Sequence, residues 1–187
     1  MVEVRRLDIE GVLEIRPARY ADDRGFFSEV WNRERWHEAG IDTEFVQDNH
    51  SLSKERGVLR GLHYQAAPMA QAKLVRVTRG AVFDVAVDIR TGSPSFGRWV
   101  ATILSVEQWN QLFIPAGFAH GFLTLEPDCE VVYKVSAPYS AEHDRAIRFD
   151  DPDIAIDWPI ATNQLILSAK DRSAPRLVEV QTGITFL

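Results

Sequence analysis

The chain has 187 residues, 45% of them hydrophobic and 26% charged, which is the composition of an ordinary globular protein with a substantial core. Its 21 Lys and Arg against 27 Asp and Glu give a net charge of −6, which disfavours binding to nucleic acid. The single cysteine, Cys129, excludes an intrachain disulfide, and without a signal-peptide or membrane-spanning apolar run we expect a cytoplasmic protein that does not contact a membrane.

The first predicted element is a helix near the N-terminus. In NRERWHEAG, Asn32 can cap the helix and Gly40 can end it. Much of the later chain alternates with the period of two that is typical of strands. In AVFDVAVDI, residues 81–89, the apolar residues at odd positions share one face, while Asp84 and Asp88 take the other.

Further short segments, rich in β-branched and aromatic residues and separated by turn residues, each predict a strand. They are KLVRVT (73–78), RWVATILS (98–105), NQLFIP (110–115), HGFLTL (120–125), EVVYKVSA (130–137) and AIRFD (146–150). SVEQ (105–108) has the form of a capping box for one short turn, and LSAKDRSAPRL (167–177) predicts turns and short helical pieces. This pattern predicts a mostly β fold, a double-sheet jelly roll, forming one domain over residues 1–187.

The stretch RGLHYQ, residues 60–65, places an arginine and a histidine beside apolar residues. Such a histidine is most often a core or rim residue whose ring is satisfied by a backbone carbonyl. Here other polar side chains fall on predicted strands or in the C-terminal turn, and a jelly roll gathers inward-facing groups at one mouth. The set is Arg60, His63, Lys73, Asp84, His120, Tyr133 and Asp171. A base, an acid and two cations in one cavity suit carbanion chemistry.

Members of this set also have structural interpretations when each is taken alone. Asp84 can point to solvent, Tyr133 can be a core residue, and Asp171, three residues after Ser168, can belong to a helix-capping turn. Only the combination favours a functional site.

The spacing of Arg60 and His63 raises a geometric problem. A regular strand would send these two side chains to opposite faces. A bulge at Gly61, which lies between them, can re-aim one of them.

A metal site is the alternative suggested by PAGFAHGF, residues 115–122, which matches half of the cupin signature with His120 at the ligand position. A metal-binding cupin would have a second histidine two residues after His63 and a carboxylate soon afterwards. Gln65 stands at the first place, and the following segment has no carboxylate and ends in Lys73, whose ammonium is a poor neighbour for a metal. We therefore expect no metal.

Several segments, in order along most of the chain, carry a resemblance to a known family. They are DDRGFFSEVWN, FVQDNHSLS, GVLRGLHYQ, KLVRVTRGAVFDVAVDIR, SPSFGRWV, QLFIPAGFAHGF, VVYK and LSAKDR. With them the chain resembles the dTDP-4-dehydrorhamnose 3,5-epimerases of rhamnose biosynthesis. The resemblance implies a double-stranded β-helix (cupin-like jelly roll), an isomerase without metal or other cofactor, and a homodimer.

The reaction implied by the resemblance is inversion of dTDP-4-dehydro-6-deoxy-D-glucose at C3 and C5, the carbons beside the C4 ketone. By motif, His63 resembles the general base and Asp171 its hydrogen-bonded orienter. Tyr133 resembles the acid on the opposite face, and Lys73 the cation that stabilises the enolate. The residues that resemble contacts to the substrate are Arg60, His120, Asp144 and Lys170, and those that resemble contacts to the nucleotide, some from a partner subunit, are Arg24, Glu29, Gln47 and Asn49.

General chemistry supports these roles. An α-C–H is a very weak acid, so an enolate needs a preorganised cation or donor where its charge develops. A neutral imidazole is a suitable base near neutral pH, and a carboxylate partner fixes its tautomer. Inversion also requires a second group that returns the proton on the other face.

Two positions depart from the family's pattern. Asp144 stands where the family usually has Glu, and FDDP (149–152) replaces WNDP. Three alternatives stay open: a monofunctional 3- or 5-epimerase of secondary metabolism, a metal-dependent cupin oxygenase, and a non-catalytic jelly roll that binds sugar nucleotides.

Overall fold

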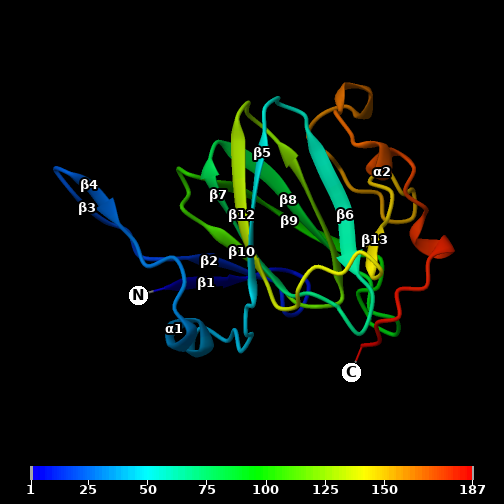
Figure 1. Ribbon diagram of the computed structural model, residues 1–187, viewed down its shortest axis with the longest axis horizontal. Helices are drawn as coiled ribbons and strands as arrows, with labels where there is room; N and C mark the ends of the chain where they lie inside the picture. Colours follow the sequence, from blue (N-terminus) through cyan, green and yellow to red (C-terminus); the bar gives the residue numbers. More distant parts are fainter. Residues whose placement is uncertain (1, 187) are drawn as a thin grey trace.

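The computed structural model describes residues 2–186, and two antiparallel β-sheets face each other in it (Figure 1). The first sheet has the order β1 (Glu3–Arg6), β2 (Leu13–Arg16), β10 (Gln111–Ile114), β7 (Lys73–Arg79), β12 (Cys129–Val135) and β5 (Gln47–Ser53). The second has the order β13 (Asp144–Ala146), β6 (Leu59–Gln65), β11 (Phe118–Thr124), β8 (Ala81–Asp88) and β9 (Trp99–Ser105). The predicted mostly β jelly roll is confirmed.

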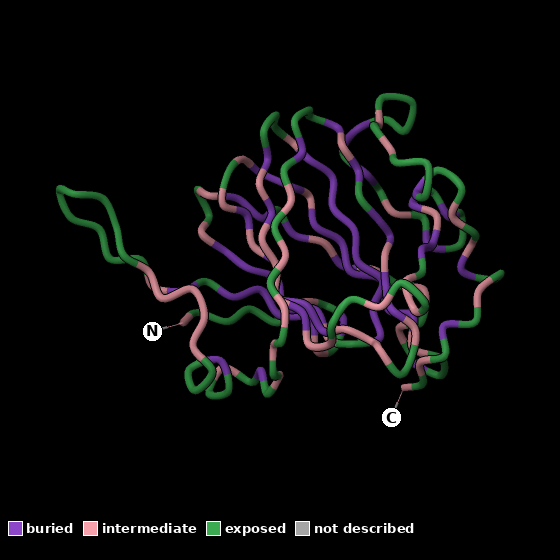
Figure 2. The backbone as a smooth tube through the Cα atoms, viewed as in Figure 1, coloured by how far each residue is buried: buried purple, intermediate pink, exposed green. Residues whose placement is uncertain are grey.

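Three apolar clusters pack on the faces of these sheets, and the buried positions follow the strands in Figure 2. Alternate residues such as Val75, Ala86 and Val131 fill the space between the sheets. The outer face of the five-stranded sheet is covered by the chain that follows β13, including Trp158. The outer face of the six-stranded sheet is covered by the segment around Trp36. Central strands such as β8 and β11 are therefore buried on both faces.

The predicted N-terminal helix is present as α1 (Arg33–Glu38). The side chain of Asn32 accepts a hydrogen bond from the backbone N–H of Arg35 at 3.2 Å, which is the expected cap. Gly40 follows the helix with φ +91°. Because α1 carries the buried Trp36, its role is to cover the outer face of the six-stranded sheet.

The other helical predictions also hold. In SVEQ the hydroxyl of Ser105 accepts from the backbone N–H of Gln108 at 3.1 Å, closing the short turn. The C-terminal segment contains α2 (Ala169–Arg172) and a 3₁₀ turn at Leu177–Glu179, and another such turn lies at Thr162–Gln164. No helix within residues 2–186 is long and apolar enough to cross a membrane.

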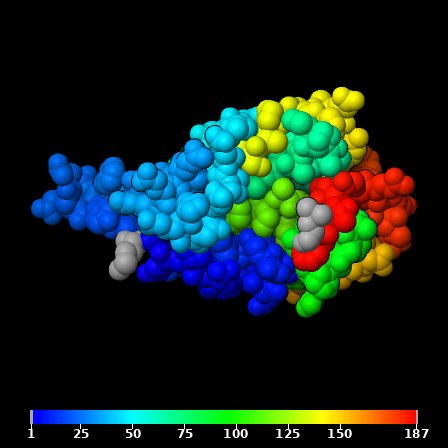
Figure 3. Space-filling view, turned by 90° about the horizontal axis from the view of Figure 1, so that it is seen from below, coloured from blue at the N-terminus to red at the C-terminus, as the bar shows by residue number. Residues whose placement is uncertain are grey.

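A two-stranded hairpin, β3 (Tyr20–Asp22) and β4 (Gly25–Phe27), projects from the two sheets at the left of Figure 1. The view from below shows the same projection, while the C-terminal segment lies at the other end of the molecule (Figure 3). Every residue of the hairpin is exposed, and Phe27 keeps 69% of its surface accessible. An exposed aromatic arm of this kind is typical of a surface that contacts another chain.

The prediction of a strand at AIRFD was wrong beyond its first residue. Strand β13 ends at Ala146, although the backbones of Ile147 and Leu62 still exchange hydrogen bonds of 2.9 and 3.1 Å. The backbone N–H of Arg148 then donates to Pro175 at 2.8 Å, so the C-terminal segment replaces β6 as the partner of this stretch.

A bulge in β6 places Arg60 and His63 on the same face, as the sequence suggested. On the neighbouring strand β11, Phe122 pairs with Arg60 and His120 pairs with His63. Three steps along β6 therefore oppose two steps along β11, so β6 contains one extra residue. Gly61 lies in this irregular stretch with φ +141°.

We predict that Gly61→Ala lowers the free energy of unfolding by more than about 2 kcal/mol. A methyl group at Gly61 would lie 2.5 Å from the Cα of Gly121, and the φ of +141° is one that L-residues rarely adopt. Gly92→Ala is the matched control, because Gly92 has φ +87° but no atom within 4 Å of the added methyl group. Denaturant unfolding of both variants measures the difference, and equal stability would contradict the close approach of β6 and β11.

Candidate active site

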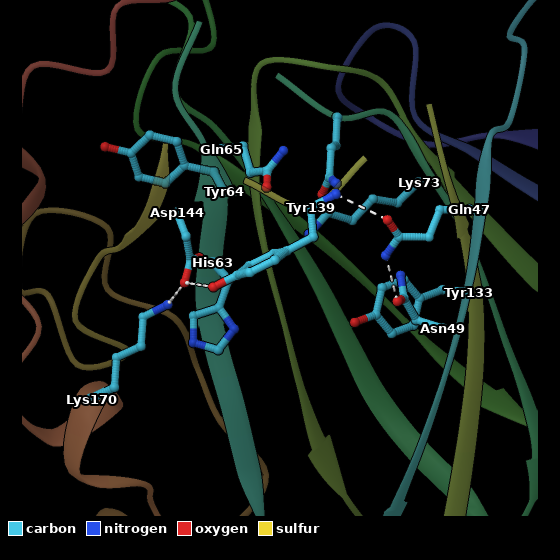
Figure 4. Close-up of a pocket in the computed structure, with 11 residues that line it drawn as sticks. Gln47, Asn49, His63, Tyr64, Gln65, Lys73, Tyr133, Tyr139, Asp144 and Lys170 are labelled. Carbon is cyan, nitrogen blue, oxygen red and sulfur yellow. Dashed lines mark hydrogen bonds and ion pairs between the residues drawn. The ribbon is translucent and has the colours of Figure 1, made fainter. Parts of the chain in front are cut away.

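Two adjoining cavities of about 410 and 400 Å³ open between the two sheets and share His63, Lys73 and Tyr133. The first is also lined by Gln47, Asn49, Tyr64, Gln65, Gln71, Tyr139, Asp144 and Lys170. The second is also lined by Ser51, Val58, Leu59, Arg60, His120, Phe122, Ile166, Leu167, Ser168 and Asp171. All the predicted site residues except Arg24, Glu29 and Asp84 therefore line one or both of these cavities. Figure 4 shows those of the first cavity.

His63 is hydrogen-bonded to a buried carboxylate. Its Nε2 lies 2.5 Å from Oδ1 of Asp171, whose side chain is 3% exposed. The other carboxylate oxygen of Asp171 accepts from the hydroxyl of Ser168 at 2.8 Å, and this hydroxyl accepts from the backbone N–H of Asp171 at 3.1 Å. Asp171 thus combines both roles considered from the sequence, since it belongs to the cap of α2 and also holds His63.

The charge of Asp171 defines the tautomer of His63. Burial raises the pKa of Asp171, but hydrogen bonds from His63 and Ser168 outweigh burial and bring the pKa below its usual value. An ionised carboxylate only accepts hydrogen bonds, so Nε2 of His63 carries the hydrogen and Nδ1 carries the lone pair. Nδ1 is therefore the basic atom of this pair.

We predict that Asp171→Asn lowers turnover by roughly 10²–10⁴-fold with a small change in melting temperature. The neutral amide cannot stabilise the imidazolium that forms when His63 takes a proton. Its NH₂ group also pairs with a nitrogen lone pair, which favours the wrong tautomer. Steady-state kinetics and thermal unfolding measure the two effects.

Ser168→Ala is the matched comparison, because it removes the helix cap and keeps the contact between Asp171 and His63. We expect it to lose about 1 kcal/mol of stability and to retain more turnover than Asp171→Asn. The reverse order of turnover in the two variants would assign Asp171 to capping alone.

Lys73 is a buried cation on β7, with 7% of its surface exposed. Burial lowers its pKa to about 8, against the opposing charges of Asp84 and Asp144, which raise it. At neutral pH the side chain is protonated, so the cavity contains a poorly hydrated ammonium. Such a cation stabilises negative charge that develops on a bound ligand far better than a cation in water does.

A second histidine–carboxylate pair lies beside Lys73. Nε2 of His120 is 2.9 and 3.0 Å from the two carboxylate oxygens of Asp84, and Asp84 is fully buried. The sequence left open that Asp84 points to solvent. The structure shows instead that its side chain is buried. Because a buried carboxylate requires partners, Asp84 fixes the orientation of the His120 ring.

Tyr133 faces the cavity from β12, next to β7 in the six-stranded sheet. Burial raises the pKa of its hydroxyl, although the charge of Arg60 opposes the shift. The hydroxyl is therefore protonated at neutral pH and can act as a proton donor. Arg60 itself spans the two sheets, since its guanidinium donates to the hydroxyl of Ser53 at 3.1 Å and to the carbonyl of Leu52 at 3.1 Å.

The rim of the first cavity carries polar and charged groups. Gln47 donates to the side-chain oxygen of Asn49 at 2.8 Å. On the opposite side, Lys170 reaches from α2 to Asp144 on β13, where Nζ and Oδ2 are 2.5 Å apart (Figure 4). Asp144 has a shorter side chain than the Glu that the family usually has here, but it still pairs with a cation at the mouth of the cavity.

Arg24 and Glu29 do not join the site. Arg24 lies at the tip of the projecting hairpin and pairs with Asp22, and its side chain is 90% exposed. Glu29 follows the hairpin and pairs with Arg35 of α1 at 3.0 Å. Neither residue lines either cavity of its own chain.

The side chains of the cavity do not suit a metal ion. Among residues 2–186, no three His, Cys, Asp or Glu side chains gather as a possible metal site. Gln65, at the place of the second cupin histidine, bonds instead to the backbones of Met69, Pro138 and Ser140. With the ammonium of Lys73 in the same space, this donor set argues against the metal-dependent oxygenase.

Sequence reasoning missed several residues that line the site. Tyr139 is 62% exposed at the mouth of the first cavity, and Gln65 and Gln71 also line it. The dipeptide Pro138–Tyr139 after a predicted strand reads as an ordinary turn. No periodicity marks Gln71 and Tyr139, because loops bring them to the cavity, whereas Gln65 is the last residue of β6.

The comparisons with known proteins agree with one another. A family model described as dTDP-4-dehydrorhamnose 3,5-epimerase matches residues 6–179. A curated dTDP-4-dehydrorhamnose 3,5-epimerase from Sinorhizobium fredii is 54% identical over 182 residues, which cover 97% of this chain and 92% of that protein.

Two solved structures are similar over most of the chain. A dTDP-6-deoxy-D-glucose-3,5-epimerase from Legionella pneumophila, in complex with dTDP-4-keto-L-rhamnose, superposes with a TM-score of 0.95 at 45% identity and covers 100% of both chains. A 3'-monoepimerase from Streptomyces bikiniensis, in complex with dTDP-quinovose, gives a TM-score of 0.84 at 38% identity, over 92% of this chain and 86% of that one.

Proposed function

The chain belongs to the dTDP-4-dehydrorhamnose 3,5-epimerase family, and we propose that it inverts C3 and C5 of dTDP-4-dehydro-6-deoxy-D-glucose with His63 as the base and Tyr133 as the acid. The observation that supports these roles is the pairing of His63 with the buried Asp171 in a space that also contains Lys73 and Tyr133. The product is dTDP-4-dehydro-L-rhamnose, in the biosynthesis of dTDP-L-rhamnose.

The proposed chemistry has two proton transfers at each carbon. Nδ1 of His63 removes the α-proton, and the electrons of the broken C–H bond form an enolate on the C4 oxygen. The ammonium of Lys73 stabilises that oxygen. The Tyr133 hydroxyl then delivers a proton to the same carbon on the opposite face, so the configuration inverts. Solvent returns a proton to Tyr133 and takes one from His63.

Several other residues of the two cavities bind the substrate. Arg60 and Lys170 are cations that suit the diphosphate, and His120 is oriented by Asp84 toward the cavity. Gln47 and Asn49 supply hydrogen-bonding groups for the nucleotide at the rim. The exposed ring of Tyr139 offers a flat face on which thymine can stack.

The test of the proposed function is incubation of the protein with the 4-keto sugar nucleotide in D₂O, in the presence of EDTA. We expect deuterium at both C3 and C5, because each inversion passes through an enolate that is reprotonated from exchangeable groups. Incorporation at one carbon only would identify a monofunctional epimerase, and a loss of activity with EDTA that a divalent ion restores would contradict the metal-free mechanism.

We also propose that the chain acts as a homodimer in which Arg24 and Glu29 serve the cavity of the partner subunit. The hairpin that carries Arg24 projects from the two sheets (Figure 1). Its Phe26 and Phe27 side chains are exposed. Burial of this arm against a second copy would remove that surface from water and bring the charge of Arg24 to an anionic ligand.

A subunit-mixing experiment tests this arrangement. We expect Arg24→Ala and His63→Ala to be poorly active alone, and an equal mixture of exchanged subunits to regain about one quarter of wild-type activity. In a mixed dimer, the cavity with an intact His63 receives the intact Arg24 of the partner. Activity that does not rise on mixing would show that Arg24 acts within its own chain or not at all.

A further inference from the structure

The loop between β12 and β13 carries Tyr139 to the mouth of the first cavity, and three glutamine side chains hold its backbone. The segment Ala137–Ser140 belongs to neither strand, so its backbone groups have no ladder partners. Backbone groups outside regular structure need partners from turns, side chains or water. The partners here come from parts of the chain that are distant in sequence.

Each residue of the segment uses one backbone group for a glutamine. Gln71 donates to the carbonyl of Ala137 at 2.7 Å. Gln65 donates to the carbonyl of Pro138 at 3.1 Å and accepts from the N–H of Ser140 at 2.7 Å. Gln47 accepts from the N–H of Tyr139 at 2.9 Å (Figure 4). We call Gln47, Gln65 and Gln71 the glutamine clamp.

The centre of the glutamine clamp is well buried, since Gln65 is 4% exposed on β6. Its second N–H donates to the carbonyl of Met69 at 2.7 Å, so one amide joins the loop before β7 to the loop after β12. An amide supplies donors and an acceptor in one plane, which a carboxylate or an imidazole at this position would not match. This use explains why glutamine replaces the histidine of a metal-binding cupin.

We infer that Gln65 and Gln71 are positioning residues that hold Tyr139 over the cavity and thereby set the affinity for the nucleotide part of the substrate. The inference rests on the proposed function, in which the ring of Tyr139 receives the thymine. A loop that is ordered before binding loses less conformational entropy when the ligand arrives, so preorganisation raises affinity. The reacting carbons lie at His63 and Lys73, which bond to none of the loop residues held by the clamp, so turnover at saturation is preserved.

The first experiment measures the clamp without any ligand, by amide hydrogen exchange. We expect the amides of Tyr139 and Ser140 to be protected in the wild type, and the amide of Ser140 to exchange much faster in Gln65→Leu. Equal exchange in the two proteins would overturn the clamp.

The second experiment measures dTDP affinity by calorimetry and substrate kinetics. We expect Gln71→Leu to weaken dTDP binding and raise KM by about 3- to 10-fold through the loss of one hydrogen bond, with little change in kcat. Gln181→Leu is the control, because Gln181 is exposed and away from both cavities. A fall in kcat at unchanged KM would overturn the inference.

A double-mutant cycle connects the glutamines to Tyr139. If the clamp acts through the ring, Gln71→Leu weakens dTDP binding in the wild type but not in a Tyr139→Ala background. Equal weakening in both backgrounds would overturn the inference. Failure of the wild type to bind dTDP would instead overturn the proposed function, while the exchange experiment would still decide whether the clamp exists.

Discussion

His63→Ala is expected to lower turnover by at least about 10²–10⁴-fold and to abolish deuterium exchange at both carbons. The variant lacks the histidine whose Nε2 pairs with Asp171 and which lines both cavities together with Lys73 and Tyr133. Stability is expected to fall as well, because Asp171 is left with Ser168 as its side-chain partner in a buried place. NMR of the sugar protons in D₂O measures exchange, and chromatography measures product.

Tyr133→Phe distinguishes the two proton-transfer roles. We expect product formation to fall in this variant while exchange continues at one carbon, because His63 still removes a proton but nothing returns it on the opposite face. Phenylalanine keeps the packing of Tyr133 against the cluster between the sheets. If exchange falls as far in Tyr133→Phe as in His63→Ala, Tyr133 assists proton removal and is not the acid.

Lys73→Met is expected to lower turnover by about 10²–10³-fold or more, since it removes the cation at the enolate oxygen. The same change is expected to leave the protein at neutral pH as stable as the wild type, or more so. Placing an ammonium in this interior lowers its pKa to about 8, a shift that corresponds to a burial penalty on the order of 3 kcal/mol. Lys134→Met, on the neighbouring strand and paired with the exposed Asp48, is the control with near-normal turnover and stability.

The pH dependence of Lys73 has opposite signs for activity and for stability. Activity needs the ammonium, so turnover is expected to decline as pH rises through about 8. The folded-state pKa lies below the unfolded value, so the burial penalty is fully present below pH 8 and disappears as pH rises toward 10.5. Over this interval the wild type should gain stability relative to Lys73→Met. If the free energies of unfolding of the two proteins changed in parallel from pH 7 to about 10, this would contradict a cation buried at this site.

The strands that pack on two apolar faces could be predicted from the sequence. In segments such as Lys73–Arg79 and Ala81–Asp88, β-branched and other apolar residues recur with the period of two of a strand. The structure has strands there. Strand β5 was not predicted, because its inward positions are polar: Gln47, Asn49 and Ser51 face the cavity where an ordinary strand would have apolar residues. Because these positions carry polar residues that line the cavity, the alternation of apolar residues that predicts a strand is absent.

The site could be predicted in part, for a related reason. Polar residues such as Lys73, His120 and Tyr133 were found because they fall on predicted strands, whose inward-facing groups a jelly roll gathers at one mouth. The glutamine clamp was not found, since Gln65 and Pro138 meet only through the closure of two loops. The resemblance named Arg24 as a contact to the nucleotide, but no motif states in which direction a hairpin projects, and Arg24 lines neither cavity of its own chain.

The position of the site between two sheets has a consequence for the evolution of the chain. His63 and His120 lie on one sheet, and Lys73 and Tyr133 lie on the other, so the apolar residues between the sheets also fix the spacing of the reacting groups. A change of one methylene group there alters packing and catalytic geometry together, because protein interiors transmit strain. We therefore expect sequence drift to be slower in that layer than beneath α1 or the C-terminal segment, and directed evolution for heat resistance to succeed mainly on the two outer layers.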